Sequence, residues 1–131
     1  MKDLRLSVLF LTLAFGAVGV GTRALVAHIS ALLSPEAPFI ATVALNLLGS
    51  FLMGLLYTVK QLGDADLWSF WTTTLGVGFL GGLTTFSTFT LDFYRLFVAG
   101  TLSMAWIYLS VSIVGGMLAL YGVMVLAENF F

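Results

Sequence analysis

Four long apolar stretches, separated by short polar turns, limit most strongly what this chain can fold into. They lie at residues 6–27, 39–59, 67–96 and 101–127. A helix needs about 20 apolar residues to cross the hydrocarbon core of a bilayer, and each stretch is long enough. Only 8% of the 131 residues are charged, against about a quarter in soluble domains. The pattern predicts an all-α membrane protein, a single domain of four transmembrane helices over residues 1–131.

Composition and motifs exclude several classes of function. A net charge of −1 provides no basic surface for nucleic acid, and the chain has no cysteine for a disulfide or thiolate site. No nucleophile–base set, metal-ligand cluster or phosphate loop is present, so we expect no enzyme. Lys2 and Arg5 precede an apolar run, as in a secretory signal, but the run continues past Gly21. We therefore expect the first span to be retained.

The basic residues are almost evenly divided between the two sides of the membrane. Lys2, Arg5 and Lys60 fall on one side, and Arg23 and Arg95 on the other. Because lysine and arginine in short loops set orientation, this balance allows insertion both ways and an antiparallel dimer. The alternative is one orientation set by Lys2 and Arg5. Four helices enclose too little interior for a wet pathway, which favours assembly.

Small residues recur four apart on two spans. The pairs are Gly78 with Gly82 and Ser50 with Gly54, and Gly115 and Gly116 lie in the middle of the fourth span. Small residues at this spacing let membrane helices approach closely. They mark either a subunit interface or packing within one chain.

Polar side chains at membrane depth are costly, so their positions are informative. Thr42 and Asn46 are four residues apart, and so are Tyr108 and Ser112, which places each pair on one helical face. Two facing rows of neutral donors could pass a small anion along. Alternatively, the hydroxyls bond their own helix carbonyls and Asn46 holds two helices together.

The third span is expected to break between Gly81 and Thr85. Two adjacent glycines and several β-branched threonines weaken a helix there. A break exposes carbonyls that suit a cation and amides that suit an anion. The alternative is an unbroken helix with a glycine-rich packing surface.

Aromatic and charged residues complete the candidate set. Phe86 and Phe89 are three apart and share a face, and the positive edges of their rings could meet an anion. Arg23 and Asp92 lie within or at the ends of spans. They could pair with each other, or Arg23 could extend to the membrane surface.

Three runs of residues resemble the small fluoride channels of the Fluc or CrcB family. They are GFLGGLTTFSTFTLD at residues 78–92, NLLGSF at 46–51 and GAVGVGTR at 16–23. The resemblance implies a dual-topology antiparallel homodimer in the plasma or inner membrane. It also implies two antiparallel pores that export fluoride passively from the cytoplasm and confer fluoride resistance.

The resemblance assigns roles residue by residue. The residues that correspond to the fluoride pore are Phe86, Phe89, Asn46, Thr42, Tyr108 and Ser112. The backbone carbonyls of Gly81 and Thr84, from both subunits, correspond to a structural sodium site at the dimer centre. Arg23, Thr85 and Asp92 are expected at the vestibule. Asp92 stands where the family usually has glutamate, and Ala24 where an aromatic residue often follows the arginine.

Two other functions compete with a channel. A small dual-topology multidrug transporter would need an acid in the first span, but none lies between Asp3 and Glu36. An accessory membrane subunit would need no transport pathway, and the two polar faces argue against it.

Overall fold

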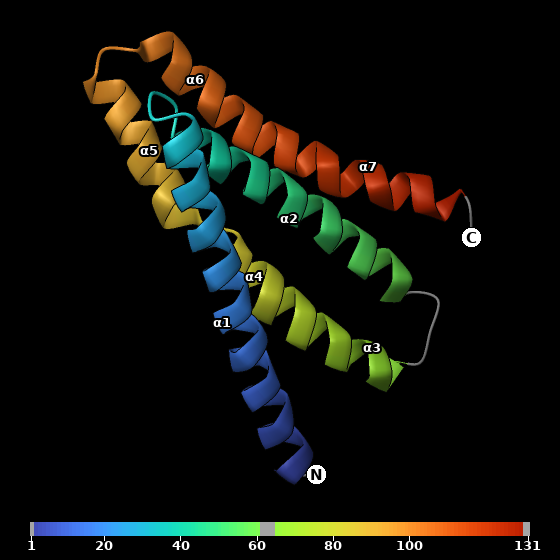
Figure 1. Cartoon of the computed structure of the whole chain (residues 1–131). Helices are drawn as coiled ribbons and strands as arrows, with labels where there is room; N and C mark the ends of the chain where they lie inside the picture. Colours follow the sequence, from blue (N-terminus) through green and yellow to red (C-terminus); the bar gives the residue numbers. More distant parts are fainter. Residues whose placement is uncertain (1, 61–64, 130–131) are drawn as a thin grey trace.

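The computed structural model describes residues 2–60 and 65–129, and in that part of the chain every regular element is helical, with no strand. In chain order the elements are α1 (Lys2–Leu33), α2 (Phe39–Lys60), α3 (Ala65–Trp71), η1 (Thr72–Leu80), α4 (Gly81–Leu83), α5 (Phe86–Val98), α6 (Leu102–Ser110), η2 (Val111–Gly115) and α7 (Gly116–Glu128). The segments η1 and η2 are π-helical. Each continues the helix before it, so α3–η1–α4 and α6–η2–α7 each read as one long rod (Figure 1).

Four stretches are long and apolar enough to cross a membrane, which confirms the expected number of spans. They are Leu6–Leu33, Phe39–Val59, Asp66–Val98 and Leu102–Ala127. The first continues to Leu33 instead of ending at Ala27, because no glycine or proline occurs between Ala27 and Pro35. The restricted backbone before that proline ends the helix.

The third span is interrupted at Thr84 and Thr85. Gly81 and Gly82 remain helical, whereas Thr84 has ψ 159° and Thr85 has φ −152° and ψ 127°, both extended. The glycines are therefore not where the helix stops. The β-branched threonines prefer extended backbone, and the helix resumes at Phe86.

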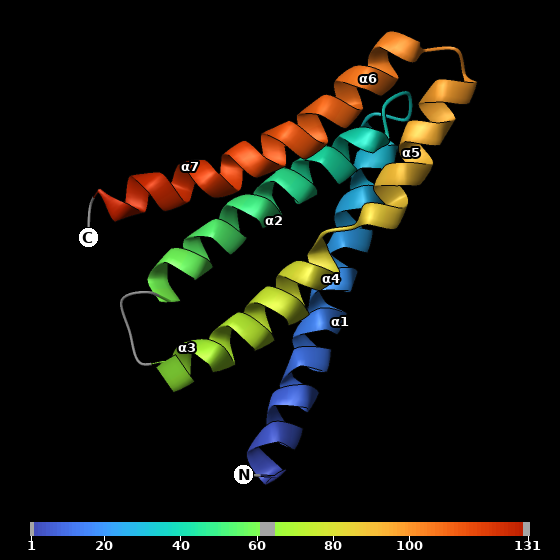
Figure 2. The same cartoon turned by 180° about the vertical axis from the view of Figure 1, so that it is seen from behind.

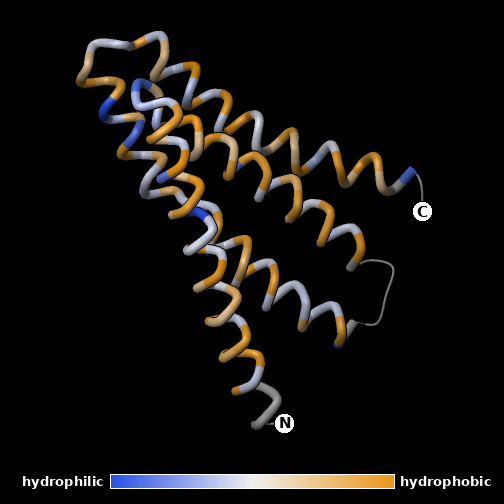
Figure 3. Tube along the Cα trace, in the orientation of Figure 1, coloured by the Kyte–Doolittle hydropathy of each residue, from blue (hydrophilic) through white to orange (hydrophobic). Residues whose placement is uncertain are grey.

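The helices form two pairs that diverge from a common end (Figures 1 and 2). One pair is α2 with α6–η2–α7, and the other is α1 with α3–η1–α4. The helix α5 lies at the common end and contacts α2 and α6. Most of the chain is hydrophobic or near neutral, and the few strongly hydrophilic stretches are mostly near α5 and the adjoining ends of α1 and α2 (Figure 3).

The small residues on the spans make close helix contacts within one chain. A Cβ at Gly82 would lie 2.5 Å from the carbonyl oxygen of Gly16 on α1, and one at Gly78 would lie 2.7 Å from that of Thr12. Likewise, a Cβ at Gly54 on α2 would lie 2.6 Å from the carbonyl oxygen of Leu120 on α7. These glycines allow backbones to touch and so hold each helix pair together.

A tight turn returns the chain from α5 to α6. Gly100 has φ +76°, a conformation that suits glycine. The N–H of Gly100 bonds to the Phe97 carbonyl at 3.1 Å and the N–H of Thr101 to that of Leu96 at 3.1 Å, which is a Schellman motif. This turn packs α6 back on α5, so Tyr108 lies beside Phe89.

Candidate functional site

Asn46 binds the backbone at the interruption with both ends of its amide. Its Oδ1 accepts the N–H of Thr85 at 2.9 Å, and its Nδ2 donates to the carbonyl of Thr85 at 3.1 Å. Asn46 on α2 thus replaces the helical acceptor that the Thr85 N–H lacks, and it adds a bond to the carbonyl of this N-cap residue. An amide has two N–H donors, so one remains for another acceptor.

The same region leaves two carbonyls without their usual helical donors. In a continuous helix the N–H of Thr85 would bond to Gly81, and the N–H of Thr88 to Thr84. Here the N–H of Thr85 donates to Asn46, and that of Thr88 donates to the Thr85 hydroxyl at 3.2 Å, which caps α5. The carbonyls of Gly81 and Thr84 therefore lose the donors that a helix would provide.

A cavity of about 370 Å³ lies beside the interruption. Its lining comes from α2, α4, the interruption, α5 and η2, and consists of Asn46, Ser50, Gly81, Thr84, Thr85, Phe86, Phe89, Ser112 and Ile113. We call it the ring cavity, after Phe86 and Phe89. The buried hydroxyl oxygen of Ser112 has no hydrogen-bond partner among the described residues. A buried hydroxyl without a partner is costly, so this oxygen is available to a ligand or water.

Phe86 and Phe89 lie together on the cavity wall but differ in burial. Their ring centroids are 5.6 Å apart, with Phe89 only 6% exposed and Phe86 75% exposed. The Phe89 ring also stacks on Tyr108 at 5.3 Å, with an interplanar angle of 23°. Tyr108 therefore covers one face of the Phe89 ring.

Asp92 on α5 contacts two of the expected pore residues, Thr42 and Tyr108. Its Oδ2 accepts the hydroxyl of Thr42 at 2.9 Å and makes a longer contact of 3.5 Å with the Tyr108 hydroxyl. Its Oδ1 is 3.7 Å from a guanidinium nitrogen of Arg95. A hydroxyl has one proton, so Thr42 cannot also donate to an anion in this arrangement.

Arg23 does not pair with Asp92, the carboxylate partner that the sequence allowed. The described ion pair of Asp92 is with Arg95, which is three residues further along the same helix. Arg23 instead lines a separate cavity of about 230 Å³ with Thr42, Thr85 and Thr88, where its buried Nε has no partner in the described part of the chain. Thr85 lines both polar cavities.

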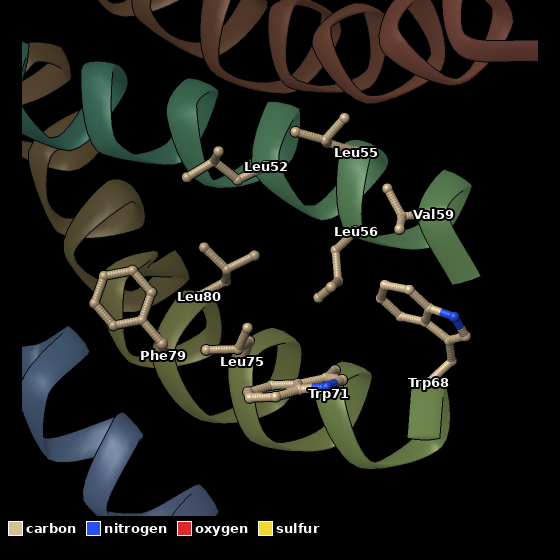
Figure 4. A pocket seen from close by; sticks show the side chains of 9 residues that line it. All are labelled: Leu52, Leu55, Leu56, Val59, Trp68, Trp71, Leu75, Phe79 and Leu80. Carbon is tan, nitrogen blue, oxygen red and sulfur yellow. The ribbon is translucent and has the colours of Figure 1, made fainter. Parts of the chain in front are cut away.

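A larger cavity, about 500 Å³, lies between α2 and α3–η1 (Figure 4). Figure 4 shows leucines, a valine, a phenylalanine and two tryptophans around it. It offers no donor beyond the two indole N–H groups. The lining of this cavity therefore favours hydrocarbon and not an ion.

Three residues at the site are not among the site residues that the sequence predicts. Ser50 lines the ring cavity, Thr88 closes the cap of α5 and Arg95 pairs with Asp92. The spacing from Asp92 to Arg95 is a helical ion-pair spacing and was a usable signal. The role of Ser50 depends on which helices meet, and the sequence offers no signal for that. The cap that Thr88 closes is local, since Thr88 follows Thr85 by three residues.

Comparison with known proteins places these features in a family. A family model described as CrcB-like protein, Camphor Resistance (CrcB), matches residues 10–124. The "Fluoride-specific ion channel FluC" of Stutzerimonas stutzeri (strain A1501) is 44% identical over 94 residues, which are 72% of this chain and 75% of that protein. A protein of the same name from Sphingopyxis alaskensis is 39% identical over 125 residues, 92% of this chain and 95% of that protein.

The match extends to all four spans, since residues 10–124 reach from the first to the fourth. Four membrane-spanning helices and relatives named as ion channels make this a multi-pass protein of the cell membrane. The chain belongs to the CrcB family.

Proposed function

We propose that this protein is a fluoride-selective channel. The observation that supports it best is the cavity at the interrupted helix, where Asn46, Ser112 and the rings of Phe86 and Phe89 meet. The relatives, which are named fluoride-specific ion channels, support the choice of ion. They are named as channels, in agreement with the sequence, which contains no catalytic motif.

The cavity provides neutral donors for an anion stripped of water. The unpartnered hydroxyl of Ser112 and the second N–H of Asn46 are free to donate. The ring edges attract an anion without a strong hydrogen bond, so the ion can leave again. Thr42 and Tyr108 act through Asp92, and Arg23 with Thr85 attracts the anion at the neighbouring cavity.

The open side of the cavity supports an antiparallel homodimer with two pores. Phe86 is 75% exposed, so one chain leaves a wall of the cavity incomplete. A second copy in the opposite orientation would close it, and by symmetry would form a second pathway. Fluoride would leave the cytoplasm passively, down its own gradient.

A sodium ion at the dimer centre fits the carbonyls of Gly81 and Thr84. Both have lost their helical donors, and hard cations prefer oxygen ligands. Asn46 and Thr85 hold these carbonyls free by taking the competing N–H groups. Bound sodium would supply positive potential between the two subunits.

Efflux from liposomes that contain the pure protein tests the proposed function. With a potassium gradient and valinomycin, a fluoride electrode should record efflux of fluoride, and a chloride electrode should record none. Protein-free liposomes control for leakage of hydrogen fluoride. A preparation silent for both ions would favour an accessory subunit and reject the channel.

Replacing either ring with isoleucine is expected to reduce fluoride flux by tenfold or more, on the order of the value of an aromatic contact made in a dry site. Isoleucine keeps an apolar wall but lacks an electropositive edge. Phe86→Ile and Phe89→Ile should therefore elute like the unmodified protein and conduct poorly. Phe97→Ile, on the same helix but outside the cavity, is the matched control. Unaltered flux in both ring variants would remove the rings from the mechanism.

Replacing sodium with N-methylglucamine during purification is expected to weaken the dimer. Without the cation, four carbonyls from two subunits would face one another uncompensated. Light scattering after size exclusion measures the fraction of monomer, and returning sodium should reverse the change. A dimer that is indifferent to the exchange would count against the central cation.

A further inference from the structure

A buried carboxylate is an unexpected neighbour for an anion pathway. Asp92 is 7% exposed and bonds to Thr42, which lines the Arg23 cavity. Its other neighbour, Tyr108, stacks on Phe89 of the ring cavity. An uncompensated negative charge here would repel an anion in either cavity, and more strongly than in water because the local dielectric constant is low.

The two oxygens of Asp92 have different surroundings. Oδ2 faces the hydroxyls of Thr42 and Tyr108, whereas Oδ1 faces Arg95 at 3.7 Å. The Arg95 side chain is 66% exposed, so its head remains at the polar surface while it reaches the carboxylate. It lies in the last turn of α5, where a helix end favours a cation.

We propose that Arg95 is the counter-ion that offsets the charge of Asp92 beside the anion pathway and thereby sets the rate of anion flux. This inference rests on the proposed channel function. Arg95 acts through Asp92 and is a positioning residue, not a ligand of the anion. The carboxylate then orients Thr42 and Tyr108 without closing the pathway electrostatically.

A purely structural role for the pair makes a different prediction. An ion pair three residues apart on a helix contributes little to folding when one partner, here Arg95, is largely exposed. If it did no more than that, removing the positive charge would leave flux unchanged. If Arg95 offsets Asp92, its loss should reduce flux, and a second loss of charge at Asp92 should restore it.

The experiment compares fluoride efflux from liposomes for a set of charge variants. Arg95→Gln is expected to reduce flux about tenfold, the order expected for one uncompensated charge at this range. Arg95→Lys should retain most of the flux, and the double variant Asp92→Asn with Arg95→Gln should recover most of it. Arg95→Met, which keeps the apolar stem, repeats the charge loss if the glutamine variant does not elute as a folded dimer.

A matched control separates local from overall charge. Asp66→Asn with Arg95→Gln has the same net charge as the restoring pair, but Asp66 lies at the other end of the third span. Its fluoride flux should remain as low as that of Arg95→Gln alone. Arg95→Gln flux equal to that of an active parent, or a double variant no faster than Arg95→Gln, would overturn this inference alone. A silent parent protein would overturn the channel proposal and this inference with it.

Discussion

Asn46→Asp is expected to reduce fluoride flux by at least about a hundredfold, the combined effect of one lost donor and one added charge in a site of low dielectric constant. The aspartate can still accept the N–H of Thr85, which Oδ1 of Asn46 accepts at 2.9 Å. The oxygen that replaces Nδ2 has two possible states. When protonated it bonds to the Thr85 carbonyl and offers no second N–H; when ionised it repels fluoride. Flux falls in both states.

The chain offers a matched control for this substitution. Asn129 is exposed at the end of α7, beyond the fourth span, and bonds to the carbonyl of Val125. Asn129→Asp makes the same chemical change outside the bilayer, so flux should equal that of the parent. Liposome efflux at one pH and one gradient measures both variants. Flux near the parent value in Asn46→Asp would place Asn46 outside the anion pathway.

Gly19→Ala is expected to have the largest effect on folding, a loss of about 3 kcal/mol or more, at the upper end for overpacked interiors. A Cβ at Gly19 would overlap the carbonyl oxygen of Phe79 and lie 3.0 Å from the backbone nitrogen of Leu83. Both neighbours are backbone, so neither can turn aside. The helix α1 would have to separate from η1 and α4.

Gly21 provides the comparison on the same helix. A Cβ there would meet no atom within 4 Å. Gly21→Ala should therefore be neutral or stabilising by up to about 1 kcal/mol, because alanine favours the helix. Thermal unfolding in detergent, followed by size exclusion, measures both. Equal melting temperatures for the two variants would contradict the close contact between α1 and the third span.

The candidate site could be assembled from the sequence only in part. Thr42 with Asn46, and Tyr108 with Ser112, were grouped by helical spacing alone, and the two pairs do come from helices that pack together. The two members of each pair have different contacts, however. Asn46 and Ser112 line the ring cavity, while Thr42 and Tyr108 turn to Asp92. Spacing identifies a shared face, but the partner on the opposite helix decides where each proton points.

The number and kind of the spans followed from the sequence by itself. The cost of burying polar backbone in lipid acts on every run of about 20 apolar residues, whatever its neighbours are. The interruption of the third span lies within the expected range, Gly81 to Thr85, but at its far end. Gly81 and Gly82 looked weakest, yet the helix stops at Thr84, because Asn46 from another span binds the backbone of Thr85. The ion pair of Asp92 with Arg95 is local, because the two residues are three apart on α5, and the sequence already contains that spacing. Only the tertiary structure brings Asn46 within bonding distance of Thr85, which is 39 residues away, and a linear pattern holds no information on that distance.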